Sequence, residues 1–250
     1  MRAKTNISQL IDRINPEKLQ YNTEIIKILS DKTILAWILK YTVEEFMHCE
    51  IEEIRECIEG TPEIHTRKVL PGKTPESITG MNTADLVLDE GESYFDIYFY
   101  AYPPDGEKTK IIINVEAQNK YDEKYDIVTR AIFYCARMIS AQHGTEFVNS
   151  NYQDIKKVYS IWICPNVPKR VEYTITSHKI VKKDICGEVP DEDYYDLLEV
   201  IIIRLGKDKN RTKGNRLHGL LSTLLSGKIN VSDKKEILKQ EFGIQTTVEV

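Results

Sequence analysis

The chain has 250 residues, 41% of them hydrophobic, which is enough to bury the core of one large domain. Its formal net charge of −5 argues against indiscriminate binding of nucleic acid but is compatible with a local basic surface. The five cysteines form no Cys-x-x-Cys pair or zinc-spaced cluster, and the sequence shows no signal peptide and no apolar run long enough to span a membrane. We therefore expect a cytoplasmic protein with reduced thiols and no membrane partner.

The N-terminal part of the chain is expected to be helical. Apolar residues recur at helical spacing over residues 33–49, behind Asp31 as a candidate N-cap. Residues 50–59 are rich in acid and predict a second helix or an extension of the first. Gly60 then provides a stop.

Three strand candidates follow at residues 84–88, 94–102 and 111–118, because each is rich in β-branched or aromatic residues. Turns are predicted between them at residues 89–92 and 103–106, where acidic residues, proline and glycine gather. Three such strands in succession predict a meander.

A helix is predicted over residues 126–143, with Gly144 as a left-handed cap. Residues 158–164 are expected to form a buried strand, and residues 171–182 and 198–204 are further strand candidates. The resulting fold class is α/β, in the order helix, three-strand meander, helix, strand, with extra strands.

The chain ends with two predicted helices, over residues 214–225 and 232–242. Ser232 is a candidate N-cap of the second helix and Gly243 a candidate stop. The predicted division of the chain is an N-terminal polar segment, a main α/β domain, and a basic linker with C-terminal helices, over residues 1–30, 31–205 and 206–250.

Polar residues alternate with apolar ones at the end of the third strand candidate. Side chains two apart on a strand point to the same face, so Asn114, Glu116 and Gln118 share one face. Asp96 lies in the same way among the aromatic residues of the preceding strand candidate. If the two strands are neighbours, Asp96 and Glu116 converge, and two carboxylates at the edge of a core favour a hard divalent cation. A structural pair satisfied by arginine or tyrosine is the alternative.

Residues 80–165 resemble the PD-(D/E)XK nuclease superfamily, and more closely its branch of recombination-promoting nucleases or transposases. The matching stretches are residues 80–83, 95–101, 111–118, 130–147 and 155–164. The likeness extends more weakly over most of the chain. It implies a restriction-endonuclease-like core, a hydrolase acting on phosphodiester bonds, and DNA as the partner.

The resemblance also implies roles for the residues of the site. Asp96 and Glu116 would coordinate Mg²⁺, with Mn²⁺ as the alternative ion, and the carbonyl of Ala117 would be a further ligand. Gln118 stands where the motif has a lysine. It cannot supply a charge, but its amide would position the attacking water.

Two helices are expected to contribute further groups. Many relatives have a helical carboxylate, which Glu45, or with less support Glu44, would supply. Arg130 and Tyr134 lie four residues apart on the predicted helix that follows the meander, so they share a face. Either they contact phosphate, or Tyr134 belongs to the core while Arg130 is solvated or pairs with Asp126.

Charge is unevenly distributed along the sequence. Residues 204–216 carry six basic residues against the single acidic Asp208. They could steer nucleic acid together with five other lysines: Lys156, Lys157, Lys179, Lys182 and Lys183. An exposed linker that keeps the protein soluble is the alternative. The glutamates between residues 50 and 63 form an acidic region that no duplex should approach.

Together these features predict a Mg²⁺-dependent DNA endonuclease related to recombination-promoting nucleases. One alternative is a catalytically silent nuclease fold that acts as a binding or assembly module, because Gln118 replaces the lysine and the chain is acidic. Another is an RNA nuclease, because the metal site does not distinguish the sugar. Strand transfer, a homodimer and a missing segment after Val250 also stay open.

Overall fold

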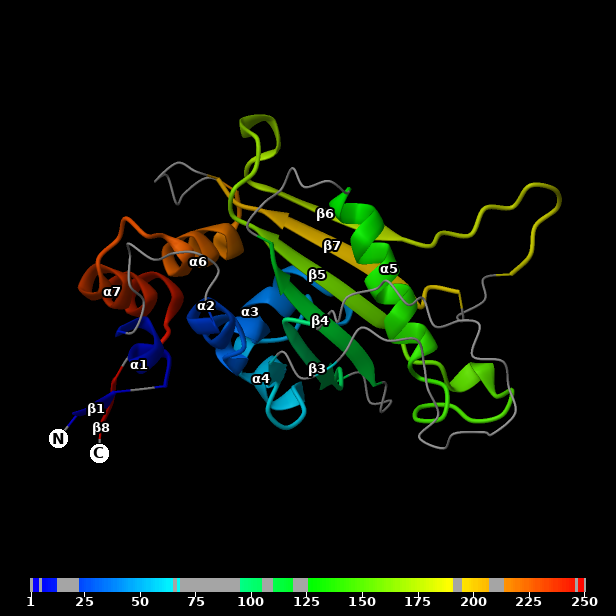
Figure 1. The fold of residues 1–250 in the computed structure, drawn as a ribbon, viewed down its shortest axis with the longest axis horizontal. Coiled ribbons are helices and arrows are strands. Elements are labelled where there is room, and N and C mark those ends of the chain that lie inside the picture. Colours follow the sequence, from blue (N-terminus) through cyan, green and yellow to red (C-terminus); the bar gives the residue numbers. More distant parts are fainter. Residues whose placement is uncertain are drawn as a thin grey trace, which may run out of the picture.

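A six-stranded mixed sheet runs through the middle of the molecule (Figure 1). The structure is a computed structural model, and it describes residues 2–4, 6–12, 23–64, 67, 95–104, 110–118, 126–190, 195–206, 214–245 and 247–249. In spatial order the strands are β2 (Glu63–Ile64), β3 (Ile97–Ala101), β4 (Ile111–Ala117), β5 (Val158–Cys164), β7 (Leu198–Arg204) and β6 (Thr174–Lys179). The strands β2, β3 and β4 are antiparallel, β5 and β7 run parallel to β4, and β6 returns antiparallel at the edge.

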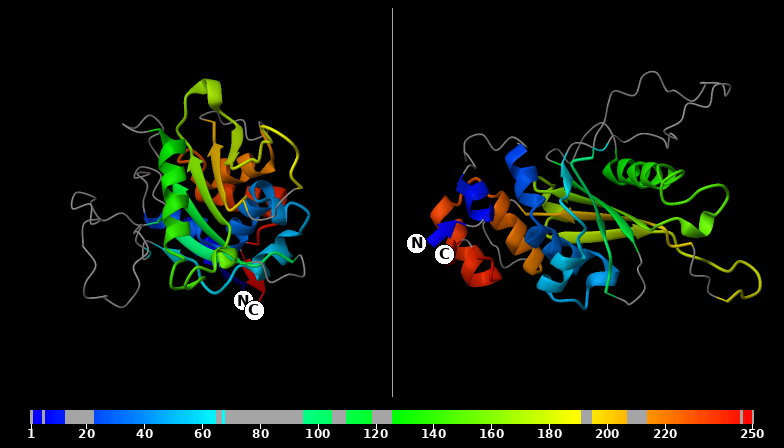
Figure 2. Two further views of the ribbon diagram at one scale, coloured as in Figure 1. Left: turned by 90° about the vertical axis from the view of Figure 1, so that its right-hand side faces the viewer. Right: turned by 90° about the horizontal axis from the view of Figure 1, so that it is seen from below.

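The helices lie on both faces of this sheet. They are α1 (Asn6–Asp12), α2 (Thr23–Leu29), α3 (Lys32–Thr42), α4 (Ile51–Cys57), α5 (Ile127–Ser140), α6 (Arg216–Leu225) and α7 (Val231–Phe242), with short 3₁₀ turns η2 (Glu44–Phe46), η3 (Tyr152–Asp154) and η4 (Lys169–Val171). Figure 2 shows α5 on one face of the sheet, whereas α3, α4 and α6 lie on the other. We call these the α5 face and the α3 face. The strands β1 (Arg2–Lys4) and β8 (Thr247–Glu249) pair beside the two termini.

The central strands are apolar on both sides because both faces are covered. In β5, Tyr159, Ile161 and Ile163 belong to the core on the α3 face. Trp162 and Cys164, which alternate with them, belong to the core on the α5 face. Every residue of β5 is buried, which explains why the strand is apolar in sequence apart from Ser160.

The predicted α/β class and restriction-endonuclease-like core are confirmed. The strands predicted at residues 158–164 and 198–204 have those bounds in the structure. The strand predicted at residues 84–88 lies outside the described residues. Within the described part, β2 takes the edge position beside β3.

Helix ends follow the predicted capping chemistry in part. Asp31 caps α3 by accepting a hydrogen bond from the backbone N–H of Thr33 (2.8 Å). Gly243 ends α7 in the left-handed conformation, with φ at 68°. The N-cap of α7 is Asn230 and not Ser232, because the amide oxygen of Asn230 accepts from the backbone N–H of Asp233.

The helix α5 ends earlier than predicted. Its last residue is Ser140, and Gly144 lies in the turn that follows, with φ at 83°. The backbone N–H of Gly144 donates to the carbonyl of Phe147 (2.8 Å), so this glycine closes a turn and does not cap the helix.

Helices from each of the three predicted segments contribute to one core on the α3 face. Ile11 of α1 and Leu39 of α3 belong to it, together with Leu221 of α6 and Leu238 of α7. None of the described helices is long and apolar enough to cross a membrane.

Candidate functional site

The pairing of β3 with β4 places Asp96 beside Glu116, as predicted. Ile97 is opposite Val115 in the antiparallel register. Asp96, which precedes Ile97, therefore lies opposite Glu116, which follows Val115. The backbone N–H of Asp96 donates to Oε1 of Glu116 (3.1 Å). In return, the backbone N–H of Ala117 donates to Oδ2 of Asp96 (2.9 Å). Each carboxylate is thus held by the backbone of the opposite strand, and we call Asp96 and Glu116 the carboxylate pair.

Asn114 supports the carboxylate pair from within the core. Its side chain is fully buried, and its Nδ2 donates to Oε1 of Glu116 (2.8 Å). Its Oδ1 is also buried, and among the described residues it accepts no hydrogen bond. A buried acceptor without a donor is unfavourable, so this oxygen suits a water held in the site.

Burial raises the pKa of Glu116 well above its usual value, and the neighbouring negative charge of Asp96 raises it further. Hydrogen bonds from Asp96 and Asn114 and the positive charge of Arg130 lower this pKa but do not offset burial. With the side chain only 5% exposed, an ionised Glu116 needs a cation nearby.

The residues around the carboxylate pair fit a hydrated divalent ion. Carboxylate oxygens are hard ligands, and Mg²⁺ in proteins commonly uses one or two carboxylates and keeps several waters. Ala117 lies next to both carboxylates through its N–H bond to Asp96. The described residues contain no group of three or more His, Cys, Asp or Glu side chains that could hold a metal, so protein carboxylates alone would not complete the shell.

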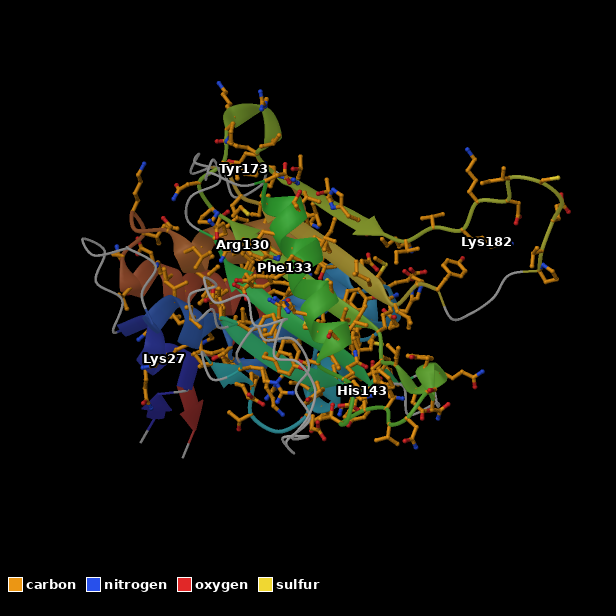
Figure 3. The ribbon with its side chains drawn as sticks, turned by 45° about the vertical axis from the view of Figure 1, so that its right-hand side comes forward. Lys27, Arg130, Phe133, His143, Tyr173 and Lys182 are labelled. Atoms are coloured by element: carbon orange, nitrogen blue, oxygen red, sulfur yellow. The ribbon has the colours of Figure 1, made fainter. Side chains whose placement is uncertain are left out.

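Arg130 of α5 lies over the aromatic residues beside the carboxylate pair. Trp162 of β5 is the register partner of Glu116, and the guanidinium of Arg130 lies 5.2 Å from the centre of the Trp162 ring. Arg130 also donates to the hydroxyl of Tyr134 (3.0 Å). Figure 3 labels Arg130 on α5. This position brings a positive charge close enough to influence Glu116.

Tyr134 is part of the core. It is 3% exposed, and its ring packs edge-on against Phe95 (5.4 Å between ring centres) and at a tilt against Trp162 (5.3 Å). The ring of Tyr134 is therefore a core side chain, as one of the two alternatives predicted, while its hydroxyl accepts a hydrogen bond that orients Arg130.

Gln118 follows β4 directly. Its backbone N–H donates to the carbonyl of Ile163 on β5 (2.9 Å), which continues the strand pairing by one residue. The alternation of β4 therefore extends to Gln118 and places it on the α5 face, with Glu116.

The structure does not bring Glu45 to the carboxylate pair. Glu45 lies in η2, and its Oε2 accepts a hydrogen bond from the hydroxyl of Tyr159 (2.6 Å). Tyr159 belongs to the core on the α3 face, so Glu45 and Asp96 lie on opposite faces of the sheet. Glu44 is exposed and pairs with Lys179 (3.3 Å).

A partly buried charge cluster surrounds Lys157 on this opposite face, and the sequence did not reveal it. The ammonium of Lys157 lies 2.9 Å from Asp196, 3.3 Å from Glu45 and 3.8 Å from Glu199. Lys157 forms ion pairs with these three carboxylates, so it is not part of an open basic surface. Only the tertiary fold brings these four residues together, so no local spacing predicts them.

Other lysines of the predicted basic surface also face carboxylates. Lys179 pairs with Glu44, and Lys182 pairs with Asp184 (3.2 Å). Residues 207–213, which carry most of the predicted basic stretch, lie outside the described residues.

Comparison with protein families gives a match over residues 78–241 to the family described as PD-(D/E)XK nuclease family transposase. The match covers well over half of the 250 residues and includes the carboxylate pair, Gln118 and α5. Comparisons with curated proteins and with solved structures give no significant match.

Proposed function

The chain belongs to the PD-(D/E)XK nuclease family transposases, and we propose that it is a metal-dependent DNA endonuclease that hydrolyses phosphodiester bonds. The observation that carries the proposal is the pair of hydrogen bonds by which the backbones of β3 and β4 hold the carboxylates of Glu116 and Asp96. These hydrogen bonds fix two carboxylates side by side where β3 and β4 pair. Nucleases of this class generally use divalent metal ions. We propose Mg²⁺, with Mn²⁺ as an alternative.

The carboxylate pair would hold the ion, and the carbonyl of Ala117 would be a further ligand. A bound divalent ion supplies a water of lowered pKa and stabilises the charge that develops on the phosphate. Glu116 would bind the ion as a carboxylate, and the charge of the ion would oppose the burial that raises its pKa. Asn114 holds Oε1 of Glu116 in place and offers Oδ1 to a bound water.

Gln118 and Arg130 would together replace the lysine that the motif usually has, one by orienting the water and the other by supplying the positive charge. The amide of Gln118 would orient the attacking water, since it can both donate and accept hydrogen bonds. Arg130 would supply the positive charge and contact a phosphate oxygen. Its planar guanidinium is held over Trp162 and tied to the hydroxyl of Tyr134, so little side-chain freedom is lost on binding.

Supercoiled plasmid incubated with purified protein and Mg²⁺ or Mn²⁺ tests the proposal. We expect nicking by the wild type, and a loss of more than about 100-fold for Asp96→Asn and Glu116→Gln, as when a group that stabilises a transition-state charge is removed. Asp184→Asn and Glu52→Gln, exposed carboxylates far from the pair in sequence, are matched controls and should cleave normally. Nicking that survives both site substitutions belongs to another enzyme and overturns the proposal.

Gln118 in the lysine position favours a second candidate, a nuclease fold without catalysis that binds or assembles with a partner. This candidate predicts binding of nucleic acid that is unchanged by Asp96→Asn and independent of metal. Parallel assays on single- and double-stranded DNA and RNA separate a DNA nuclease from an RNA nuclease. The five free cysteines agree with the cytoplasmic location that we propose for either candidate.

A further inference from the structure

A short turn projects from the end of β5 on the side of the molecule where α5 begins (Figure 1). It comprises residues 165–174 and includes η4, and we call it the basic turn. Val167 is 1% exposed and belongs to the core on the α5 face, together with Trp162 and Tyr134. Val171 packs against the same core. The basic turn is therefore anchored in the core on the α5 face, to which the aromatic residues near the carboxylate pair also belong.

Two exposed basic residues lie between these anchors. Lys169 and Arg170 form the first two residues of η4, and both are exposed. Neither has an ion-pair partner among the described residues. They differ in this from Lys157, Lys179 and Lys182, whose ammonium groups face carboxylates.

Several contacts fix the backbone of the basic turn. The N–H of Val171 donates to the carbonyl of Pro168 (3.0 Å), and the hydroxyl of Thr174 donates to the carbonyl of Val171 (2.8 Å). Tyr173 has a φ of 59°, in the left-handed region that costs about 1 kcal/mol or more for a residue with a side chain. Residues in such conformations persist only where the surroundings hold them in place.

Gly206 leaves room for the side chain of Tyr173. A Cβ at position 206 would lie 1.9 Å from the ring of Tyr173, so the ring packs directly on the glycine backbone. The ring also lies 6.2 Å from that of His218 on α6. Figure 3 labels Tyr173 at the base of the projection. The basic turn is thus a rigid support, and it presents its two cations at a defined place.

The distribution of charge favours approach of a polyanion from this side. Arg130 lies over Trp162 on the α5 face. On the α3 face, α4 presents exposed carboxylates instead: Glu52, Glu53 and Glu56. A nucleic acid that reaches the carboxylate pair therefore meets cations on the α5 side and repulsion on the other.

We propose that Lys169 and Arg170 bind backbone phosphates of duplex DNA beside the bond that is cut. This inference rests on the proposed function, since it takes DNA as the substrate of the carboxylate pair. Phosphate contacts of this kind position a duplex without reading its sequence.

Duplex binding in a metal-free buffer with chelator tests this inference, because no cleavage occurs there. Fluorescence anisotropy of a labelled duplex is measured between about 50 and about 200 mM salt. For the double variant Lys169→Ala/Arg170→Ala we expect about tenfold weaker binding at the lowest salt. The slope of log K against log salt should flatten by about 2, since two phosphate contacts are lost at about 0.9 each.

The control is the double variant Lys228→Ala/Lys239→Ala, which removes the same charge from exposed positions around α7. It should bind as the wild type does, and Lys169→Arg/Arg170→Lys should retain the affinity and the slope. The inference is overturned if Lys169→Ala/Arg170→Ala binds as the wild type does, if the control loses as much, or if the wild type binds no duplex. Melting curves confirm that each variant is folded.

Cleavage assays on the same proteins separate this inference from the proposed function. A wild type that binds through Lys169 and Arg170 but never cleaves with Mg²⁺ or Mn²⁺ contradicts the proposed function and leaves the phosphate contacts standing. A wild type that cleaves, with Lys169→Ala/Arg170→Ala binding and cleaving equally well, overturns the inference and leaves the function standing.

Discussion

At the residue scale, the arrangement of the carboxylate pair that suits metal binding also destabilises the metal-free fold. Both side chains are held by good hydrogen bonds, yet their like charges lie side by side and Glu116 is buried. Neutralising one of them should therefore stabilise the metal-free fold while it removes one of the two proposed metal ligands.

We expect Glu116→Gln to raise the melting temperature of the metal-free protein at pH 8. The amide oxygen of the glutamine can still accept from Asp96 and Asn114. In the wild type the pKa of Glu116 is raised in the folded state, so above the unfolded value of 4.5 the folded state binds more protons. Stability is then lost as pH rises toward the folded pKa, and the advantage of the variant should grow from pH 5 to pH 8.

Thermal unfolding with chelator at the two pH values measures this effect. The exposed Glu52→Gln serves as the control and should show no such growth with pH. A wild type that is more stable than Glu116→Gln at pH 8 contradicts the prediction.

Gly206 is a second residue with a defined mechanical role. We expect Gly206→Ala to lower the free energy of unfolding by about 1–3 kcal/mol, because the new methyl group overlaps the ring of Tyr173. Gly187 has φ at 68° and open space around it, so Gly187→Ala measures the backbone effect alone, about 1 kcal/mol. Urea unfolding of both variants measures these free energies. A loss for Gly206→Ala that equals or falls below the loss for Gly187→Ala contradicts the predicted overlap with the ring of Tyr173.

The sequence predicted the carboxylate pair because two strands of alternating pattern flank a turn, which leaves few ways to pair them. It did not predict the support from Asn114, although Asn114 was placed on the correct face. The position of Glu45 depends on the face of the sheet that its helix covers. Periodicity identifies the apolar side of a helix but not the sheet face against which that side packs.

At the element scale, α7 is tied to the end of α6 by a buried lysine. Lys234 is 2% exposed, and its ammonium donates to the carbonyl of Leu224 (2.9 Å) in the last turn of α6. A helix leaves its last carbonyls without partners, so this contact satisfies one of them. Burial lowers the pKa of Lys234 to about 8.

This lowered pKa predicts a pH-dependent stability. Between pH 8 and pH 10.5 an unfolded lysine keeps its proton while the folded Lys234 loses it, so the wild type gains stability as pH rises. Relative to Lys234→Met, the gain should reach up to about 3 kcal/mol. Chemical unfolding across this range measures it, with Lys239→Met as the exposed control. A constant difference between wild type and Lys234→Met contradicts the burial of the ammonium.

Elements with strong local signals were predicted well. The strand β5 is apolar apart from Ser160, and β7 contains the apolar run of residues 200–203. The helix α5 begins at the capping residue Asp126, and α7 ends at Gly243. The edge strand β2 has two residues, too few for a periodic pattern, and pairs with β3 through long-range contact. The order in which β7 lies between β5 and β6 is likewise set by packing across the whole sheet.

At the scale of the whole molecule, the two faces of the sheet have different roles. The α5 face carries the carboxylate pair, Arg130 and the basic turn. The α3 face carries the larger core and the charge cluster around Lys157. Its role is structural, because this core joins the helices α1, α3, α6 and α7 to the sheet. The net charge of −5 does not reveal this division, since it sums the charges of both faces.

Calorimetric titration of the chelator-stripped protein with Mn²⁺ tests whether Asp96 and Glu116 together bind one divalent ion, as we propose. We expect one ion per chain, and no binding by Asp96→Asn or Glu116→Gln. Glu45→Gln, which alters a carboxylate on the opposite face, should bind as the wild type does. Binding that persists in both site variants, or no binding by the wild type, contradicts the account.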